Sequence, residues 1–255
     1  MKLIIIFTLI FYSNYFNNDW GSTGHRVVGE IAEQNISNET RKKIFDLLNG
    51  NSIAYVSTYA DEIKSSSIFK NYNYWHYANL KLDQKYKTSK KNPKGDVYFG
   101  IKKCIEILND NTISKKEKQF YLKLLIHLIG DLHQPLHLGK KEDRGGNDIK
   151  IKWFDKFSNL HRVWDSNMIN YSRLSYSELS NNLPAVSDKV KKQIISAPIE
   201  KWFEETHNLT KDIYNKLPKD KILGYKYYHE NFDIIRLQLL KAGLRLAYTL
   251  DQIFK

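Results

Sequence analysis

The spacing of apolar residues constrains the fold most, because it follows a helical period along much of the chain. Four stretches place apolar side chains three and four positions apart, which predicts amphipathic helices. These stretches are residues 23–34, 38–48, 97–108 and 233–254. A fifth and longer helix is predicted to open at Ser114, where Ser-x-x-Glu is typical of a helix start, and to end or bend at Pro135. The pattern therefore predicts a mainly α-helical fold.

One segment has the alternation of a strand instead. Residues 149–154 alternate apolar and polar side chains directly after the turn residues Gly145-Gly146-Asn147-Asp148, so we expect a small β-hairpin there. Residues 80–96 are rich in Lys and Asn and are predicted to form a surface loop. The chain has 255 residues and no long linker, which fits one large domain with a substantial core.

The N-terminal segment resembles a secretory signal peptide. Lys2 precedes the apolar run Leu3–Tyr12, which is shorter than the ~20 residues that a membrane-spanning helix needs. Signal peptides carry apolar runs of ~7–15 residues. We predict a signal peptide over residues 1–19, a mature domain over 20–255, a secreted or periplasmic location and no stable membrane insertion. Asn17 and Asp19 do not form the usual pair of small residues before a cleavage site.

Charge and cysteine content narrow the possible functions. The formal net charge is +12, which attracts polyanions such as nucleic acid or an anionic membrane face, although a Lys-rich surface can also serve solvation alone. Cys104 is the single cysteine, so an intramolecular disulfide is excluded. Its apolar neighbours predict a buried side chain.

Two pairs of His and Asp carry the strongest chemical information. His127 and Asp131 are four residues apart, as are His161 and Asp165, and this spacing places both members of a pair on one helical face. His137 follows the first pair closely. A single pair of this kind is more often an ion pair. Two pairs and a nearby histidine favour a group of nitrogen and oxygen ligands suited to zinc.

Further donors lie upstream. His25 opens the first predicted helix, Asp61 follows Tyr59-Ala60, and His76 lies in a run of aromatic residues. Each alone is best explained as a polar group at a helix end. His133 is two positions after Asp131 and should point away from it, so we predict a structural role. His207 and His229 have no paired donors and are predicted to lie at the surface or the edge of the core.

Taken together, these residues resemble a known family. The ordered set is Trp20, His25, Asp61, His76, His127, Asp131, His137, His161 and Asp165. It is similar to the ligand set of the zinc-dependent mung bean nuclease family, whose members are single-strand-specific nucleases and 3′-nucleotidases. The runs Leu128–Leu136 and Arg144–Asn147 also look like the signature of this family. The resemblance extends from Trp20 to the last helix.

The resemblance implies a single-domain, multi-helical fold related to zinc-dependent phospholipase C, with three Zn²⁺ ions. One zinc would be held by Asp61, His76, His127 and Asp131. A second would be held by His25, Asp131 and the α-amino group and carbonyl of Trp20, which requires Trp20 to be the mature N-terminus. The third would be held by His137, His161 and Asp165. A zinc-activated hydroxide would then attack phosphorus.

The resemblance also implies residues that contact substrate. It implies that the catalytic residues are Lys64, which would face the scissile phosphate, and Asp61. Tyr77 would stack on an unpaired base, Asn79 stands where many members use Asp to recognise the base, and Asn147 would lie beside that pocket. The expected substrates are single-stranded DNA and RNA, cleaved to 5′-phosphate products, and 3′-nucleotides. Nothing in the sequence demands more than a monomer.

Two other functions stay open at this level. A zinc-dependent phospholipase C-type phosphodiesterase would share the fold, but the short interval from Trp20 to His25 and the final Asp165 favour the nuclease. A basic nucleic-acid-binding protein with structural zinc is the other alternative. Structural zinc sites are closed by four protein ligands. The third predicted group offers only three, which leaves a position for water or substrate and favours catalysis.

Overall fold

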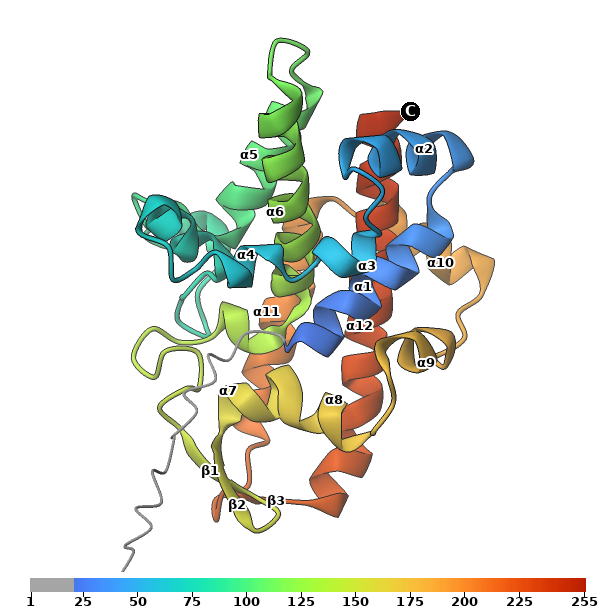
Figure 1. Cartoon of the computed structure of the whole chain (residues 1–255). Coiled ribbons are helices and arrows are strands. Elements are labelled where there is room, and N and C mark those ends of the chain that lie inside the picture. The colour runs from blue at the N-terminus through green and yellow to red at the C-terminus, as the bar shows by residue number, and fades with distance from the viewer. Residues whose placement is uncertain (1–20) are drawn as a thin grey trace, which may run out of the picture.

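The computed structural model describes residues 21–255, and helices make up most of them (Figure 1). The α-helices are α1 (Ser22–Asn35), α2 (Asn38–Leu47), α3 (Ile53–Val56), α4 (Tyr59–Glu62), α5 (Val97–Asn109), α6 (Lys115–His133), α7 (Leu160–Arg162), α8 (Met168–Tyr171), α9 (Tyr176–Asn181), α10 (Asp188–Ser196), α11 (Ile199–Asn215) and α12 (Tyr225–Phe254). Three 3₁₀ segments are η1 (Ser67–His76), η2 (Tyr86–Thr88) and η3 (Pro135–Leu138), and a π-helical turn is η4 (Val163–Asn167). The predicted mainly α class is confirmed.

Three of the five predicted helices, α2, α5 and α6, begin at a residue whose side chain caps the helix. The side chain of Ser37 accepts a hydrogen bond at the start of α2, and that of Ser114 accepts one from the backbone N–H of Glu117 at the start of α6. Pro135 begins η3, so α6 ends before it, as expected. The last helix begins at Tyr225 rather than at residue 233. Its first turns are largely exposed, and the apolar pattern therefore misses them.

Helix α6 lies at the centre of the fold. Every residue from Leu124 to His133 is buried, because α1, α5, α11 and α12 pack around this half of the helix (Figure 1). A helix buried on all sides has no polar face turned to water, so polar side chains on it need partners inside the protein. His127 and Asp131 are two of these side chains.

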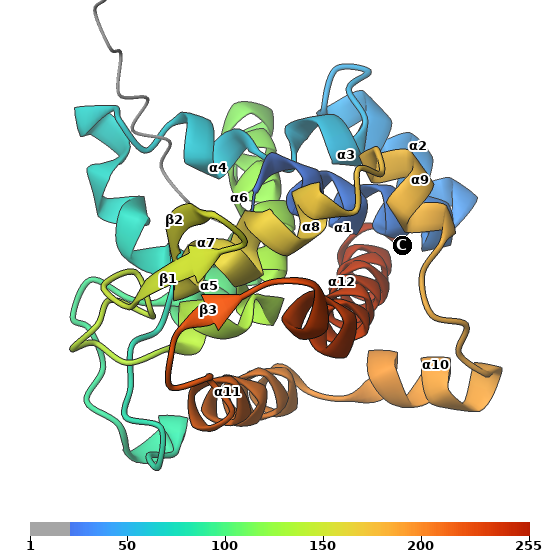
Figure 2. The same cartoon turned by 90° about the horizontal axis from the view of Figure 1, so that it is seen from below.

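A small sheet leads directly into the region of the third predicted ligand group. Strand β1 (Lys150–Trp153) pairs antiparallel with β2 (Lys156–Asn159), which confirms the predicted hairpin. Strand β3 (Ile222–Leu223) adds to β1 in parallel, a pairing that the sequence analysis did not predict. The side chain of Asn159 caps α7 at the end of β2, and Figure 2 shows the hairpin beside α7. His161 therefore follows the sheet at once.

Several smaller predictions have clear outcomes. Residues 80–96 form a loop with the single turn η2, and Cys104 is a buried free thiol, as predicted. Within residues 21–255, no helix has both the length and the apolar character needed to cross a membrane. The predicted signal peptide over residues 1–19 lies outside the described residues and stays a prediction.

Candidate metal centre

The centre is built around His127 and Asp131 on α6. The ring Nδ1 of His127 donates to the backbone carbonyl of Ser57 at 2.7 Å, which directs Nε2 toward Asp131. His127 Nε2 lies 3.2 Å from Asp131 Oδ2. A backbone carbonyl behind an imidazole is the usual way in which a protein fixes the ring nitrogen that faces a metal ion.

Two side chains from other segments complete the first cluster, which consists of Asp61, His76 and His127. Asp61 Oδ1 lies 3.3 Å from His127 Nε2 and 3.6 Å from His76 Nδ1. Asp61 belongs to the short helix α4, and His76 is the last residue of η1. His76 Nδ1 also lies 2.9 Å from Asp131 Oδ2, so Asp131 adjoins this cluster.

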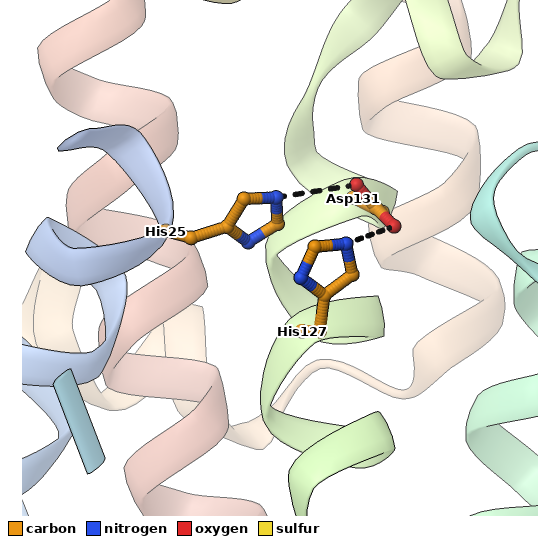
Figure 3. Close-up of side chains that lie close together, drawn as sticks. All are labelled: His25, His127 and Asp131. Carbon is orange, nitrogen blue, oxygen red and sulfur yellow. Dashed lines mark ion pairs between the residues drawn. The ribbon is translucent and has the colours of Figure 1, made fainter. Parts of the chain in front are cut away.

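The second cluster adds His25 from α1 to His127 and Asp131 (Figure 3). His25 Nε2 lies 3.5 Å from Asp131 Oδ1, and its ring stacks on that of His127 with 3.7 Å between the ring centroids. Gly130 makes this approach possible, because a Cβ atom there would lie 2.8 Å from His25 Nδ1. Trp20, the predicted further ligand, lies outside the described residues.

The third cluster consists of His137, His161 and Asp165. His137 on η3 joins it to the others, because its Nδ1 lies 3.1 Å from Asp131 Oδ1 and its Nε2 lies 3.9 Å from Asp165 Oδ1. The predicted four-residue spacing of His161 and Asp165 does bring both side chains together, but through the π-helical turn η4 and not through a regular α-helix. Such turns occur often at functional sites.

Gly21, the first described residue, also lies beside the third cluster. The backbone N–H of Gly21 donates to the carbonyl of Asp165 at 3.0 Å. The backbone of residue 21 is thus adjacent to the ligand groups.

One contributor was not predicted. The amide of Gln134 is fully buried, donates to Asp165 Oδ1 at 3.2 Å and lies 3.4 Å from His161 Nε2. Gln134 belongs to the run Leu128–Leu136 that drew attention in the sequence. A polar residue just before Pro135, between two predicted ligands, was the available indication.

The electrostatics of the clusters fit bound cations. Burial, and then the nearby Lys64, lower the pKa of His76 to about 4, and burial, and then His137, lower that of His161 to about 3. Burial opposes ionisation of Asp131, but the surrounding histidines outweigh it and hold its pKa well below the usual range. Neutral imidazoles and ionised carboxylates are the forms that bind metal ions.

The pKa values of two groups depart from this pattern, and a bound cation would return each group to the form that binds metal. Burial opposes charge on His127, but Asp131 and Asp61 outweigh it and raise its pKa to about 10. Burial, and then Asp61 and Asp131, raise the pKa of Asp165 well above its usual value. A divalent cation disfavours an imidazolium and stabilises a carboxylate, so it reverses both shifts.

Buried polar atoms that lack a hydrogen bond also indicate a site for metal ions. Within the described part of the chain, both carboxylate oxygens of Asp131, both ring nitrogens of His137 and Oδ2 of Asp165 are buried without a hydrogen bond. Leaving such atoms unsatisfied costs on the order of 1–3 kcal/mol each. In each cluster the candidate ligand atoms lie within 4.8 Å of one another. The residues present therefore fit metal ions with nitrogen and oxygen ligands.

Lys64 lies at the edge of the first cluster. Its Nζ is 2.9 Å from Asp61 Oδ1, and its side chain is 18% exposed. Burial lowers the pKa of Lys64 to about 8, although Asp131 and Asp165 oppose the shift. A largely buried ammonium group beside the ligands is in position to meet an anionic substrate.

A cavity of about 650 Å³ lies beside the segment that follows His76, and its described lining includes none of the candidate ligands. Tyr77 and Asn79 line it, directly after His76, and the backbone N–H of Ala78 donates to the carbonyl of His137 at 2.9 Å. Tyr74, Tyr86 and the lysines Lys81, Lys90, Lys91 and Lys141 line it too. Asn147 does not, because its amide turns to the carbonyl of Arg144. The placement of Asn147 beside the base pocket stays a prediction.

The remaining histidines lie outside the clusters. His133 Nδ1 donates to the carbonyl of Ile129, and its Nε2 lies 2.9 Å from the guanidinium of the buried Arg245, in keeping with the structural role predicted. His207 is buried against the carbonyl of Leu138, deeper than expected, and His229 is exposed.

Fold and centre together define a class, that of mainly helical hydrolases whose His and Asp side chains are grouped for metal ions. The model of the S1/P1 Nuclease family matches residues 20–255 of the chain. The chain belongs to the S1/P1 nuclease family. The predicted resemblance and the prediction of an enzyme acting on phosphodiester bonds are thereby confirmed.

Named relatives cover almost the whole chain. Endonuclease 2 of Arabidopsis thaliana is 26% identical over 99% of this chain and 96% of its own length. Nuclease S1 of Aspergillus oryzae is 24% identical over 92% of this chain and 91% of its own. Nuclease P1 of Penicillium citrinum is 26% identical over 92% and 97%.

One solved structure is similar as well. The crystal structure of the alpha-toxin of Clostridium perfringens from the avian strain SWCP has 15% identity and a TM-score of 0.48, over 93% of this chain. The chain spans 64% of that protein, less than two thirds of its length.

Proposed function

We propose that this nuclease cleaves single-stranded DNA and RNA to 5′-phosphate products, and removes phosphate from 3′-nucleotides, with three Zn²⁺ ions in its centre. The observation that carries the proposal is the carboxylate of Asp131. Its Oδ2 faces His76 and His127, and its Oδ1 faces His25 and His137, so one side chain connects all three clusters. Ions sharing a carboxylate lie close enough to act on one phosphate.

The ligands of each ion follow from the clusters. Asp61, His76, His127 and Asp131 would hold the first, and His25 and Asp131, with Trp20, the second. His137, His161 and Asp165 would hold the third, with a position left for water or substrate. Zinc bound in such sites lowers the pKa of water to about 7 and polarises phosphoryl oxygens.

The remaining chemistry belongs to side chains of the protein. Lys64 can place a positive charge against the non-bridging oxygens of the phosphate, where negative charge grows in the transition state. Asp61 holds Lys64 through the 2.9 Å contact and also belongs to the first cluster. Asp61 thus connects the ammonium group to the first cluster.

The cavity supplies the preference for single strands. Tyr77 is 36% exposed in its wall, so the ring has a free face on which a base can stack. Stacking on an aromatic ring is worth about 1–3 kcal/mol per base, and a paired base would first have to leave its duplex. Asn79 offers an amide to the edge of the base, and the lysines around the cavity attract the phosphate backbone.

The experiment compares a single-stranded oligonucleotide, an RNA, a matched duplex and 3′-AMP, with and without a chelator. We expect chelator-sensitive cleavage of all but the duplex. Tyr77→Ala should lower kcat/KM on the single strand by about 5–150-fold, the equivalent of 1–3 kcal/mol. Tyr248→Ala is the matched control, because Tyr248 is 39% exposed but lies on α12. Hydrolysis of phosphatidylcholine alone, or binding without cleavage, would overturn the proposal.

The use of Trp20 depends on processing. We propose that export removes residues 1–19, that the mature protein is a secreted or periplasmic monomer, and that the new α-amino group completes the second zinc site. N-terminal sequencing of the exported protein tests the cleavage. A glycine placed before Trp20 in an otherwise identical mature protein should remove one zinc. Three zincs in that protein would contradict the role of the amino group.

A further inference from the structure

The loop between η3 and β1 packs over the third cluster and is bonded to His161 twice. The ring Nδ1 of His161 lies 2.9 Å from the carbonyl of Gly145, and the backbone N–H of His161 donates to the carbonyl of Gly146 at 3.3 Å. A carbonyl only accepts, so Nδ1 carries the proton and Nε2 keeps the lone pair that a metal ion needs. The position of this dipeptide therefore sets the ring orientation and tautomer of His161.

The conformation of this dipeptide is not one that a chain adopts readily. Arg144, Gly145 and Gly146 all have positive φ, at 52°, 62° and 82°. A Cβ atom on Gly145 would lie only 2.4 Å from the carbonyl oxygen of Leu136. A left-handed non-glycine residue such as Arg144 costs about 1 kcal/mol or more, so surrounding bonds must impose this shape.

Asp143 provides those bonds. Its Oδ1 accepts from the backbone N–H of Gly146 at 2.9 Å and from the hydroxyl of Tyr214 at 2.8 Å. Its Oδ2 lies 3.2 Å from the ammonium of Lys140, and the side chain is only 14% exposed. Tyr214 stands on α11, so the carboxylate connects the loop to a long helix of the fold.

We propose that Asp143 and Tyr214 are positioning residues for the third metal site. They hold the 139–148 loop so that the carbonyl of Gly145 fixes the ring of His161 with Nε2 directed to Asp165 and His137. Neither residue belongs to the predicted ligand or substrate set. The inference rests on the proposed function, since it concerns the affinity of one zinc among three.

The expected effects follow from the bonds that each change removes. Loss of a group that orients a metal ligand typically lowers metal affinity by 10–100-fold. Asp143→Ala should reach that range at the third site, because it releases both Gly146 and Tyr214. Tyr214→Phe removes one bond and should cost about tenfold. Asp143→Asn keeps an acceptor oxygen and should restore most of the affinity.

The first measurement is a competition for zinc between the folded protein and a chelator, with bound zinc counted at each step. We expect one zinc to leave the Asp143→Ala and Tyr214→Phe proteins at a lower chelator concentration, while the other two leave as in the wild type. Tyr98→Phe is the matched control, because it also removes a hydroxyl bonded to a carboxylate, that of Glu200. Unchanged release, or an equal weakening of all three zincs, would overturn the positioning role.

The second measurement does not need zinc. Nitrogen NMR of labelled histidine reports which ring nitrogen of His161 carries the proton in metal-free protein. Nδ1–H should dominate in the wild type and in Asp143→Asn, and Asp143→Ala should mix the two tautomers. An unaltered Nδ1–H tautomer in Asp143→Ala would contradict the inference. Failure of the wild type to bind zinc would instead overturn the proposed function, so the two failures are distinguishable.

Discussion

The second cluster differs from the third in the backbone that carries it. His127 and Asp131 lie in the buried C-terminal half of α6, and His25 lies in α1, both regular helices within the core. His137 lies on a 3₁₀ segment, while His161 and Asp165 lie on a three-residue helix and a π-helical turn. The second cluster, the helical half of the centre, thus has its geometry fixed by helix periodicity, and the third cluster, the irregular half, by irregular backbone.

This difference shows which cluster depends on hydrogen bonds from neighbouring residues to hold its ligands in place. In a buried helix, main-chain hydrogen bonds and packing hold the ligands already. The third cluster relies on bonds from Gln134 and from the carbonyl of Gly145. We therefore expect the third ion to be the most easily removed. Each prediction below tests this contrast.

The largest effect should come from Asp131→Ala. This change removes the carboxylate that faces all three clusters. The transition state then loses several kcal/mol of charge stabilisation, which corresponds to about a 10³-fold lower kcat/KM or more. Asp165→Ala should leave two zincs bound and lower the rate less. Zinc counting and single-strand cleavage measure both variants. Equal zinc loss in the two proteins would contradict the division into helical and irregular halves.

Removal of all metal should lower the melting temperature. A ligand present at 100 times its Kd stabilises a fold by about 2.7 kcal/mol, which for a chain of this size corresponds to about 5–10 °C. Calorimetry during stepwise chelation should show that the first zinc to leave changes the melting temperature least, because the third cluster lies outside α6. A first step as large as the later ones would argue against that order.

Two glycines allow a matched comparison of smaller effects. Gly145→Ala introduces a Cβ against the backbone of Leu136 at a positive φ and should destabilise the fold by about 1–3 kcal/mol. Gly130→Ala improves helix propensity by about 1 kcal/mol, and this gain offsets part of the clash with His25. Urea unfolding should therefore show a greater loss for Gly145→Ala. A greater loss for Gly130→Ala would reverse the contrast between the two halves.

The same contrast explains what the sequence could predict. The helices with clear caps and stripes, such as α6 from Ser114 to Pro135, are local and were predicted within a few residues. The four-residue spacing of His127 and Asp131 was informative because α6 is regular. The spacing of His161 and Asp165 gave the correct pair but the wrong backbone, since a π-helical turn has no apolar period of its own.

Other features depend on contacts between distant residues. Strand β3 has only two residues and pairs with β1 from far along the chain, so no local pattern marks it. Asp61 and His76 reached the ligand set through family resemblance alone, because α4 and η1 carry no repeated spacing.

The smallest single effect is that of one buried imidazole on the pH dependence of the metal-free protein. Burial lowers the pKa of His76 to about 4 and of His161 to about 3, below the 6.5 of an unfolded chain. Between about pH 4 and 6.5 the unfolded state therefore binds more protons, and the free energy of unfolding should fall as pH falls. His25, His133 and His207 shift in the same direction.

Asp165 acts in the opposite sense, because its raised pKa keeps a proton on the folded state and its contribution is lost as pH rises. His127 also acts in that sense, because its pKa is raised to about 10. The five histidines with lowered pKa values outnumber these two groups, so below about pH 6.5 the net slope should be positive with pH, on the order of 1 kcal/mol per pH unit for each proton. Urea unfolding at several pH values measures the slope, and His76→Gln and His161→Gln should each reduce it. If only one of them does, the first and third clusters hold their imidazoles in different protonation states before any metal binds.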